Sequence, residues 1–150
     1  MQPKKSENFS KEELEDYNKL MTEKEAEQLE AFVKAKKWPV EKSGTGLYYW
    51  IYQNGEGPNA KPGQTVEVNL TITLLSGDTA YTHLRYGSER FLIDRTDKES
   101  GLNEGVQYMN KGAKAKLVMP SHLAHGLAGD LDRIPPRSSL VFDVELLDIN

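Results

Sequence analysis

Two segments in which apolar residues recur at every second position constrain the fold more than any other feature of the sequence. In residues 66–74 every second residue is aliphatic, and glutamate, asparagine or threonine stands between them. Residues 139–149 repeat the pattern, with Leu140, Phe142 and Val144 two positions apart. Successive side chains of a strand point to opposite faces, so each segment predicts a strand with one buried and one solvent-facing side.

The remaining pattern predicts an α+β fold. Further extended segments are expected at 47–52, which is rich in aromatic and β-branched residues, and at 79–83, 90–93 and 113–119. A short helix is expected at about 103–110, with Gly112 placed to end it. A long loop should cover 120–137. Strands, one helix and then strands indicate an antiparallel sheet wrapped on that helix.

The N-terminal part has a different character. Residues 1–9 are polar and are expected to form a disordered tail, and residues 10–38 are expected to form a helical extension. Apolar residues recur on one face of this extension, namely Leu14, Tyr17, Met21, Leu29, Phe32 and Val33.

Capping signals leave the number of helices in this extension open. Ser10 and Glu13 have the spacing of a capping box, and Thr22 and Glu25 repeat it, so two shorter helices are an alternative to one long helix. Pro39 discourages continuation. This extension is expected to act as a packing appendage, or alternatively to bind a protein partner.

Composition narrows the classes of function. The formal net charge of −4 provides no excess of cations to neutralise phosphates, which argues against a nucleic-acid partner. The chain has no cysteine, so disulfides and thiolate metal sites are excluded, and its 3 scattered histidines do not suggest a metal site. No apolar run approaches the about 20 residues needed to cross a bilayer. We therefore expect no metal, no nucleic acid and no transmembrane segment.

Three stretches in the second half carry motifs in a fixed order. They are Gly101-Leu102-Asn103-Glu104-Gly105-Val106 with Met109 and Gly112, Lys116-Leu117 with Pro120-Ser121, Ala124 and Gly126, and Ile134-Pro135-Pro136 with 140–147. Residues 55–66 lie in register with them. Together they resemble the FKBP-type peptidyl-prolyl cis-trans isomerases over nearly all of 46–150. The resemblance implies an FKBP-like twisted antiparallel sheet wrapped around one short helix over 44–150, after the N-terminal helical extension.

The resemblance also implies an activity and a location. Such a protein assists the folding of proline-containing chains without a covalent intermediate or a cofactor, by holding the proline in a shallow apolar pocket. The helical extension and the Tyr-Trp segment at 48–50 are similar to gliding-motility-associated and related envelope lipoproteins of Bacteroidota. A location in the cell envelope, with signal and lipid anchor removed, is therefore expected. A cytoplasmic protein is the alternative, because Met1–Lys5 does not resemble a secretory signal.

Five residues are implied to form the pocket. Ile134 and Phe142 keep the apolar identity that the family uses, and Leu102 stands where the family has a tryptophan floor. His125 stands at the position of a tyrosine that donates a hydrogen bond to the substrate carbonyl. Tyr81 is expected to replace a lost aromatic wall.

Several other matched positions depart from the family pattern. They are Leu70 for a wall tyrosine, Ala80-Tyr81 for a Phe-Asp pair, Glu89 for a phenylalanine, and Lys98-Glu99 for a Val-Ile pair. Each buried apolar side chain that is lost removes about 1.5–3 kcal/mol of contact energy. We therefore expect weak isomerase activity, with a catalytically degenerate chaperone or protein-binding module of the cell envelope as the alternative.

Overall fold

The computed structural model describes residues 9–94, 98–126 and 128–150. The disordered tail expected at 1–9 lies, apart from Phe9, outside the described residues. The elements in chain order are α1 (Lys11–Lys36), β1 (Glu41–Lys42), β2 (Tyr48–Gln53), β3 (Glu56–Asn59), β4 (Thr65–Leu74), β5 (Thr79–Thr82), α2 (His83–Tyr86), β6 (Glu89–Leu92), α3 (Ser100–Gly105), β7 (Asn110–Lys111), β8 (Lys114–Met119) and β9 (Leu140–Ile149), with 3-10 turns at Val106–Tyr108 and Ser121–Leu123.

The main sheet is antiparallel and has the strand order β1-β2-β8-β9-β4-β5. The strand β6 pairs with the first half of β4, at 65–68, and β5 pairs with its second half, at 71–73. The two long strands β4 and β9 pair along their whole length, from Val66↔Ile149 to Leu74↔Leu140. They are the two segments with apolar residues at every second position, so the prediction of a strand in each is confirmed, and the structure shows in addition that the two are neighbours.

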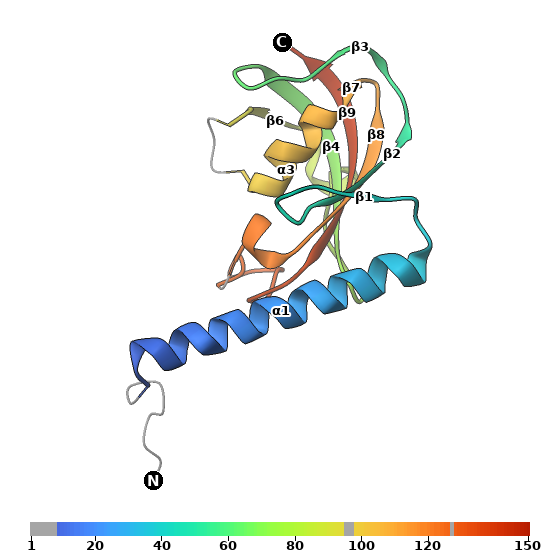
Figure 1. Ribbon diagram of the computed structural model, residues 1–150. Helices are drawn as coiled ribbons and strands as arrows, with labels where there is room; N and C mark the ends of the chain where they lie inside the picture. Colours follow the sequence, from blue (N-terminus) through green and yellow to red (C-terminus); the bar gives the residue numbers. More distant parts are fainter. Residues whose placement is uncertain (1–8, 95–97, 127) are drawn as a thin grey trace.

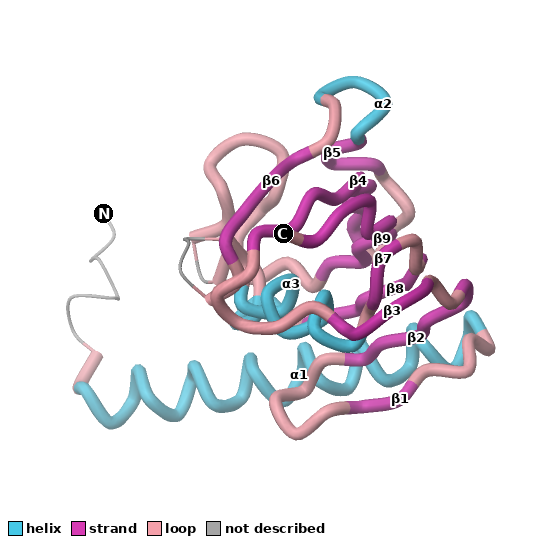
Figure 2. The backbone as a smooth tube through the Cα atoms, turned by 90° about the horizontal axis from the view of Figure 1, so that it is seen from above, coloured by secondary structure: helices cyan, strands magenta, loops and turns pink. Residues whose placement is uncertain are grey.

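The core lies between this sheet and α3. Leu102, Val106 and Met109 are fully buried against the inward side chains of β8 and β9, among them Leu117 and Phe142. In Figure 2, α3 lies on the side enclosed by the curvature of the sheet, between β6 and the β1–β2 pair. The FKBP-like arrangement of a curled sheet around one short helix is therefore present.

The single helix α1 replaces the alternative of two shorter helices. Its first turn has a complete capping box, in which the Ser10 Oγ accepts from the Glu13 amide at 3.0 Å and the Glu13 carboxylate accepts from the Ser10 amide at 2.8 Å. These contacts also lower the pKa of Glu13. The second candidate cap is not used, because the Thr22 hydroxyl donates to the Asn18 carbonyl within the helix.

Only the second half of α1 contributes buried residues to the packing on the domain. Its buried residues are Glu25, Leu29 and Val33, four positions apart, which places them on one face. The two apolar ones contact Val118 of β8 and Val141 of β9 on the outer face of the sheet. Figure 1 shows α1 lying across one end of the sheet, below the loop between β8 and β9. The division into a helical extension at 10–38 and a domain at 44–150 stays a prediction.

Local boundaries differ from those expected. The central helix begins at Ser100 rather than at about 103, and it tightens to a 3-10 turn over 106–108. The strand expected at 79–83 ends at Thr82, whose hydroxyl accepts from the Leu84 amide and so caps the short helix α2. The small β3–β7 ladder was not expected, because both strands are short and largely exposed and therefore carry no alternation of apolar residues.

Candidate active site

A cavity of about 220 Å³ opens where the edge of the sheet changes partners from β6 to β5. Its floor is formed by Leu70 and Ile72 of β4, each only 5% exposed. One wall comes from Tyr81 of β5 and Tyr86 of α2, whose rings meet edge to face with centroids 5.9 Å apart. The cavity therefore has an aliphatic floor and an aromatic wall.

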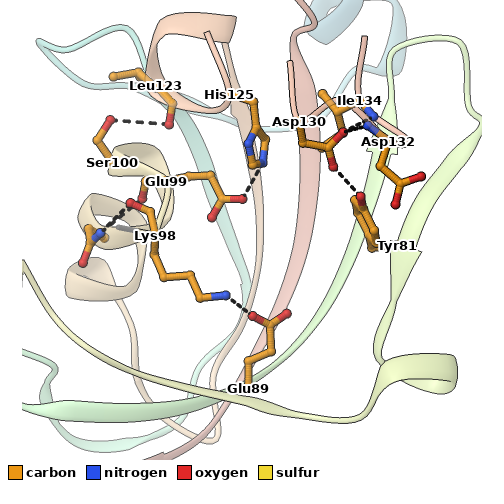
Figure 3. A network of polar contacts seen from close by, with 11 residues as sticks. Tyr81, Glu89, Lys98, Glu99, Ser100, Leu123, His125, Asp130, Asp132 and Ile134 are labelled. Atoms are coloured by element: carbon orange, nitrogen blue, oxygen red, sulfur yellow. Dashed lines mark hydrogen bonds and ion pairs between the residues drawn. The ribbon is translucent and has the colours of Figure 1, made fainter. Parts of the chain in front are cut away.

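The rim of the cavity is polar. It consists of Thr82, His83, Glu89, Lys98, Glu99, His125 and Asp130. Figure 3 shows three pairs among the labelled residues of this region, Glu89 with Lys98, Glu99 with His125, and Tyr81 with Asp130. The pair of Glu89 and Lys98 joins β6 to the segment before α3. The pair of Glu99 and His125 joins that segment to the loop between β8 and β9, and the pair of Tyr81 and Asp130 joins β5 to the same loop. Each pair therefore ties together two segments that border the cavity.

The pair of Tyr81 and Asp130 fixes the aromatic wall. The Tyr81 hydroxyl donates to the Asp130 carboxylate, and this hydrogen bond together with burial raises the pKa of Tyr81 to about 12. Burial acts to raise the pKa of Asp130, but the hydrogen bonds from Tyr81 and from the amides of Ile134 and Asp132 outweigh it, so this pKa is lowered. The Arg133 guanidinium lies 5.8 Å from the centroid of the Tyr81 ring and covers it from outside.

The pair of His125 and Glu99 determines which nitrogen of the imidazole carries a proton. The Nε2 atom of His125 lies 2.9 Å from the Glu99 carboxylate, and an ionised carboxylate can only accept. The neutral ring therefore has its N–H directed at Glu99, and Nδ1 donates only when the ring is an imidazolium. The expected free donor at His125 is thus already engaged by Glu99.

The five sequence-predicted residues fall into two groups. Tyr81 and His125 line the cavity. Leu102, Ile134 and Phe142 are at most 2% exposed and belong to the core, where they are not part of the lining. These three residues can therefore support the cavity only through the core that they share with Leu70 and Ile72. A role in catalysis stays a prediction for all five.

Sequence reasoning missed part of the lining. Ile72 could have been assigned, because it shares a face of β4 with Leu70 at a spacing of two. His83 was not assigned, since nothing in the sequence shows that α2 turns its first residue toward the cavity. Its Nδ1 lies 3.4 Å from the Leu70 carbonyl oxygen.

Residues 9–94, 98–126 and 128–150 offer neither a cluster of metal ligands nor a membrane-spanning helix. Within these ranges, no group of three or more histidine, aspartate or glutamate side chains is placed to hold a metal ion. The helices of the same ranges include none that is long and apolar enough to cross a bilayer.

Comparison with known proteins agrees with this architecture. Residues 57–147 match the family described as "FKBP-type peptidyl-prolyl cis-trans isomerase". The FKBP-type peptidyl-prolyl cis-trans isomerase FkpA of Escherichia coli K12 is 44% identical over 118 residues, which are 77% of this chain and 42% of that protein. A probable FKBP-type peptidyl-prolyl cis-trans isomerase of Haemophilus influenzae is 34% identical over 147 residues, which are 97% of this chain and 56% of that protein.

A solved structure extends the similarity beyond the domain. The crystal structure of FkpA from Escherichia coli superposes with a TM-score of 0.72 and 36% identity, over 95% of this chain and 74% of that chain. The chain spans about half the length of the curated relatives it matches. The family match covers most of the chain and includes the strands and the loop that build the cavity. The chain therefore belongs to the FKBP-type peptidyl-prolyl cis-trans isomerase family.

Proposed function

We propose that this chain catalyses cis–trans isomerisation of Xaa-Pro bonds in flexible, proline-containing polypeptides, without a covalent intermediate or a cofactor. The observation that carries the proposal is the cavity with an aliphatic floor, Leu70 and Ile72, and an aromatic wall, Tyr81 and Tyr86. Membership in the isomerase family supports the same activity.

The proposed mechanism follows from the electronic structure of the peptide bond. Rotation costs about 18–20 kcal/mol because resonance is lost in the twisted state. The twisted bond is less polar than the planar one, so an apolar, desolvated cup that grips the proline ring favours it over the ground state. The floor and wall of this cavity supply such a surface.

We further propose that the activity is weak. The charged pair of Glu89 and Lys98 stands on the rim, at positions where an apolar wall would grip the proline ring more tightly. Two hydrogen-bond donors of the lining, the Tyr81 hydroxyl and the His125 Nε2, are engaged by carboxylates. Orientation of the substrate carbonyl therefore has to compete with existing contacts.

A prolyl isomerisation assay on a short Xaa-Pro peptide tests the activity. Uncatalysed isomerisation takes tens of seconds or more at 25 °C, so a modest acceleration is measurable. We expect the wild type to accelerate the reaction and His125→Ala to reduce the acceleration. Glu30→Gln is the matched control, because Glu30 is an exposed residue on α1 away from the cavity.

A flat trace at high protein concentration would overturn the isomerase proposal. It would favour the other candidate, a binding module that keeps the fold without turnover. Calorimetry would then measure the binding of an unfolded, proline-rich polypeptide in the presence and absence of a competing Xaa-Pro peptide. Competition would show that the polypeptide binds in the cavity, and its absence that it binds elsewhere.

We propose a location in the cell envelope, on the basis of the resemblance to envelope lipoproteins described for the sequence. Fractionation of the native cells, followed by immunodetection, tests this directly. Recovery in the envelope fractions supports the proposal, and recovery with cytosolic markers alone contradicts it.

The first half of α1 supports a partner-binding role for the extension, which we also propose. Leu14, Tyr17 and Leu20 are 41%, 55% and 51% exposed, and such apolar side chains on a helix that extends beyond the domain suit a protein partner of the envelope. Photo-crosslinking from position 17 in native cells is expected to yield a specific adduct that is lost in Leu14→Glu/Leu20→Glu. An unchanged crosslinking pattern would contradict the role.

A further inference from the structure

The loop between β8 and β9, residues 120–137, carries two residues of the cavity rim, His125 and Asp130. It is long, and over its described residues it contains little regular structure beyond the short turn at Ser121–Leu123. A loop of this kind holds a fixed shape only if contacts from elsewhere restrain it. At the cavity the loop is held by the pairs of His125 with Glu99 and of Asp130 with Tyr81, and further contacts hold its start and its end.

Glu25 of α1 contacts both ends of this loop. One carboxylate oxygen, Oε1, accepts from the Ser121 amide at 3.1 Å and from the Ser121 hydroxyl at 2.6 Å. The other, Oε2, lies 3.6 Å from the guanidinium of Arg137. The Glu25 side chain is only 9% exposed and that of Arg137 18% exposed. A single buried carboxylate from a distant helix therefore bridges the start and the end of the loop.

The backbone carries this restraint toward the rim. The Arg137 amide donates to the Gly126 carbonyl at 3.0 Å, and the Gly126 amide donates to the Ser121 carbonyl at 2.7 Å. Arg137 has a positive φ of 54°, a conformation that a residue with a side chain adopts only when its surroundings impose it. Gly126 directly follows His125, so the chain of contacts from Glu25 ends beside a rim residue.

Further contacts of Arg137 strengthen the bridge from the helix side. Its guanidinium donates to the Asn18 Oδ1 at 2.6 Å and lies 5.8 Å from the centroid of the Tyr17 ring. A charge-assisted hydrogen bond of this length is stronger than a neutral one. Removal of Glu25 would leave the guanidinium of Arg137 without its partner in a mostly buried place, which favours movement of the loop end.

We propose that Glu25 is a positioning residue for the cavity, which holds the 120–137 loop so that His125 and Asp130 stay at the rim. The helix α1 then has a role in the site without touching it. Figure 1 shows the arrangement, with the loop between β8 and β9 above the middle of α1. The kinetic part of this proposal rests on the proposed isomerase activity, and the structural part does not.

Amide hydrogen exchange tests the structural part. Glu25→Ala is expected to raise exchange at Gly126 and Ile134, which do not contact Glu25, by roughly tenfold relative to amides of the β4–β9 ladder. Glu25→Gln keeps the shape but not the charge and should show a smaller rise. The control is Val33→Ala, which weakens packing of the same helix at a site that does not involve the loop.

Either of two outcomes overturns the structural part. In one, Glu25→Ala leaves exchange at Gly126 and Ile134 unchanged. In the other, Val33→Ala raises it as much as Glu25→Ala does, which would mean that Glu25 merely docks the helix. Because these amides report on the loop directly, the result stands whether or not the protein turns over a substrate.

The isomerisation assay tests the kinetic part with a double-variant comparison. Glu25→Ala should lower kcat/KM roughly fivefold in the wild-type background and much less in a His125→Ala background, since both changes then remove the same contribution. Equal losses in the two backgrounds would contradict positioning of His125. An inactive wild type would reject the proposed function instead, and the exchange measurement would still decide the role of Glu25.

Discussion

The floor and the rim of the cavity are built from neighbouring residues in very different environments. The floor residues Leu70 and Ile72 are each 5% exposed and belong to the main core. The side chains of the rim pair Lys98 and Glu89 are 32% and 37% exposed. The side chain of a floor residue has to pack against the rest of the core. The side chain of a rim residue contacts mainly solvent and its own rim partner. The comparison teaches that the fold preserves the floor, while the rim can change its chemistry without loss of the fold.

The largest expected effect lies beside the floor, on the strand paired with it, where Phe142 is the partner of Ile72. Phe142→Ala removes a fully buried ring from β9 and should lower the free energy of unfolding by about 3–5 kcal/mol, measured by denaturant titration. Glu89→Gln, as the matched rim change, should cost less than about 1 kcal/mol because the pair is partly exposed. Comparable losses in the two variants would break the distinction between floor and rim.

An intermediate effect is expected when the rim is made apolar. Glu89→Phe/Lys98→Val replaces a charged pair by side chains that can close on the proline ring, and kcat/KM should rise roughly tenfold in the isomerisation assay. Glu89→Gln/Lys98→Met removes the charges without adding a ring and serves as the control. If neither variant gains activity, the rim does not limit turnover.

The smallest effect concerns the bond between wall and rim. Tyr81→Phe removes the donor that helps to keep the pKa of Asp130 below its ordinary value of 3.8, so this pKa should rise in an NMR titration. A carboxyl group with a lowered pKa in the folded state stabilises the fold above its ordinary pKa, and this contribution disappears as the pH falls through the folded-state pKa.

The pH dependence sharpens this prediction. At about pH 7 Tyr81→Phe should be less stable than the wild type by roughly 1 kcal/mol, the usual contribution of one partly exposed hydrogen bond. The difference should shrink as the pH is lowered below 3.8. A difference that stays constant across this range would show that the ring, and not the hydrogen bond to Asp130, accounts for the loss.

The sequence alone predicts the elements whose burial is regular. The strand β4 follows from alternation over nine residues, β9 follows from apolar residues at every second position from 140 to 146, and α1 follows from its capping box. The strand β3 was missed because all four of its residues are exposed, so solvent and not the core surrounds them. Alternation of apolar and polar residues indicates a strand with one buried face. A strand with neither face buried has no such alternation and cannot be predicted from it.

The site was predictable only in part, for a related reason. Tyr81 and His125 were expected at the cavity and line it. Position along a motif could not show that the N–H of His125 is directed at Glu99, because that contact joins residues 26 positions apart. The bridge from Glu25 to Ser121 spans 96 positions. Contacts of this kind arise from the tertiary arrangement and leave no periodic trace in the sequence.

The missing side chain of Gly105 has a consequence for how this site can vary. A Cβ atom at this position would lie 2.3 Å from the Leu117 Cδ1 of β8, so the helix α3 can approach the sheet only without it. A larger residue would force either the buried Leu117 side chain or α3 to shift, and a shift of α3 would carry Glu99, which directly precedes the helix and holds His125. The position of the rim residue His125 therefore depends on a residue outside the rim, Gly105, through the placement of α3 and Glu99. Position 105 thus constrains the site through the packing of α3 on β8, although it does not line the cavity.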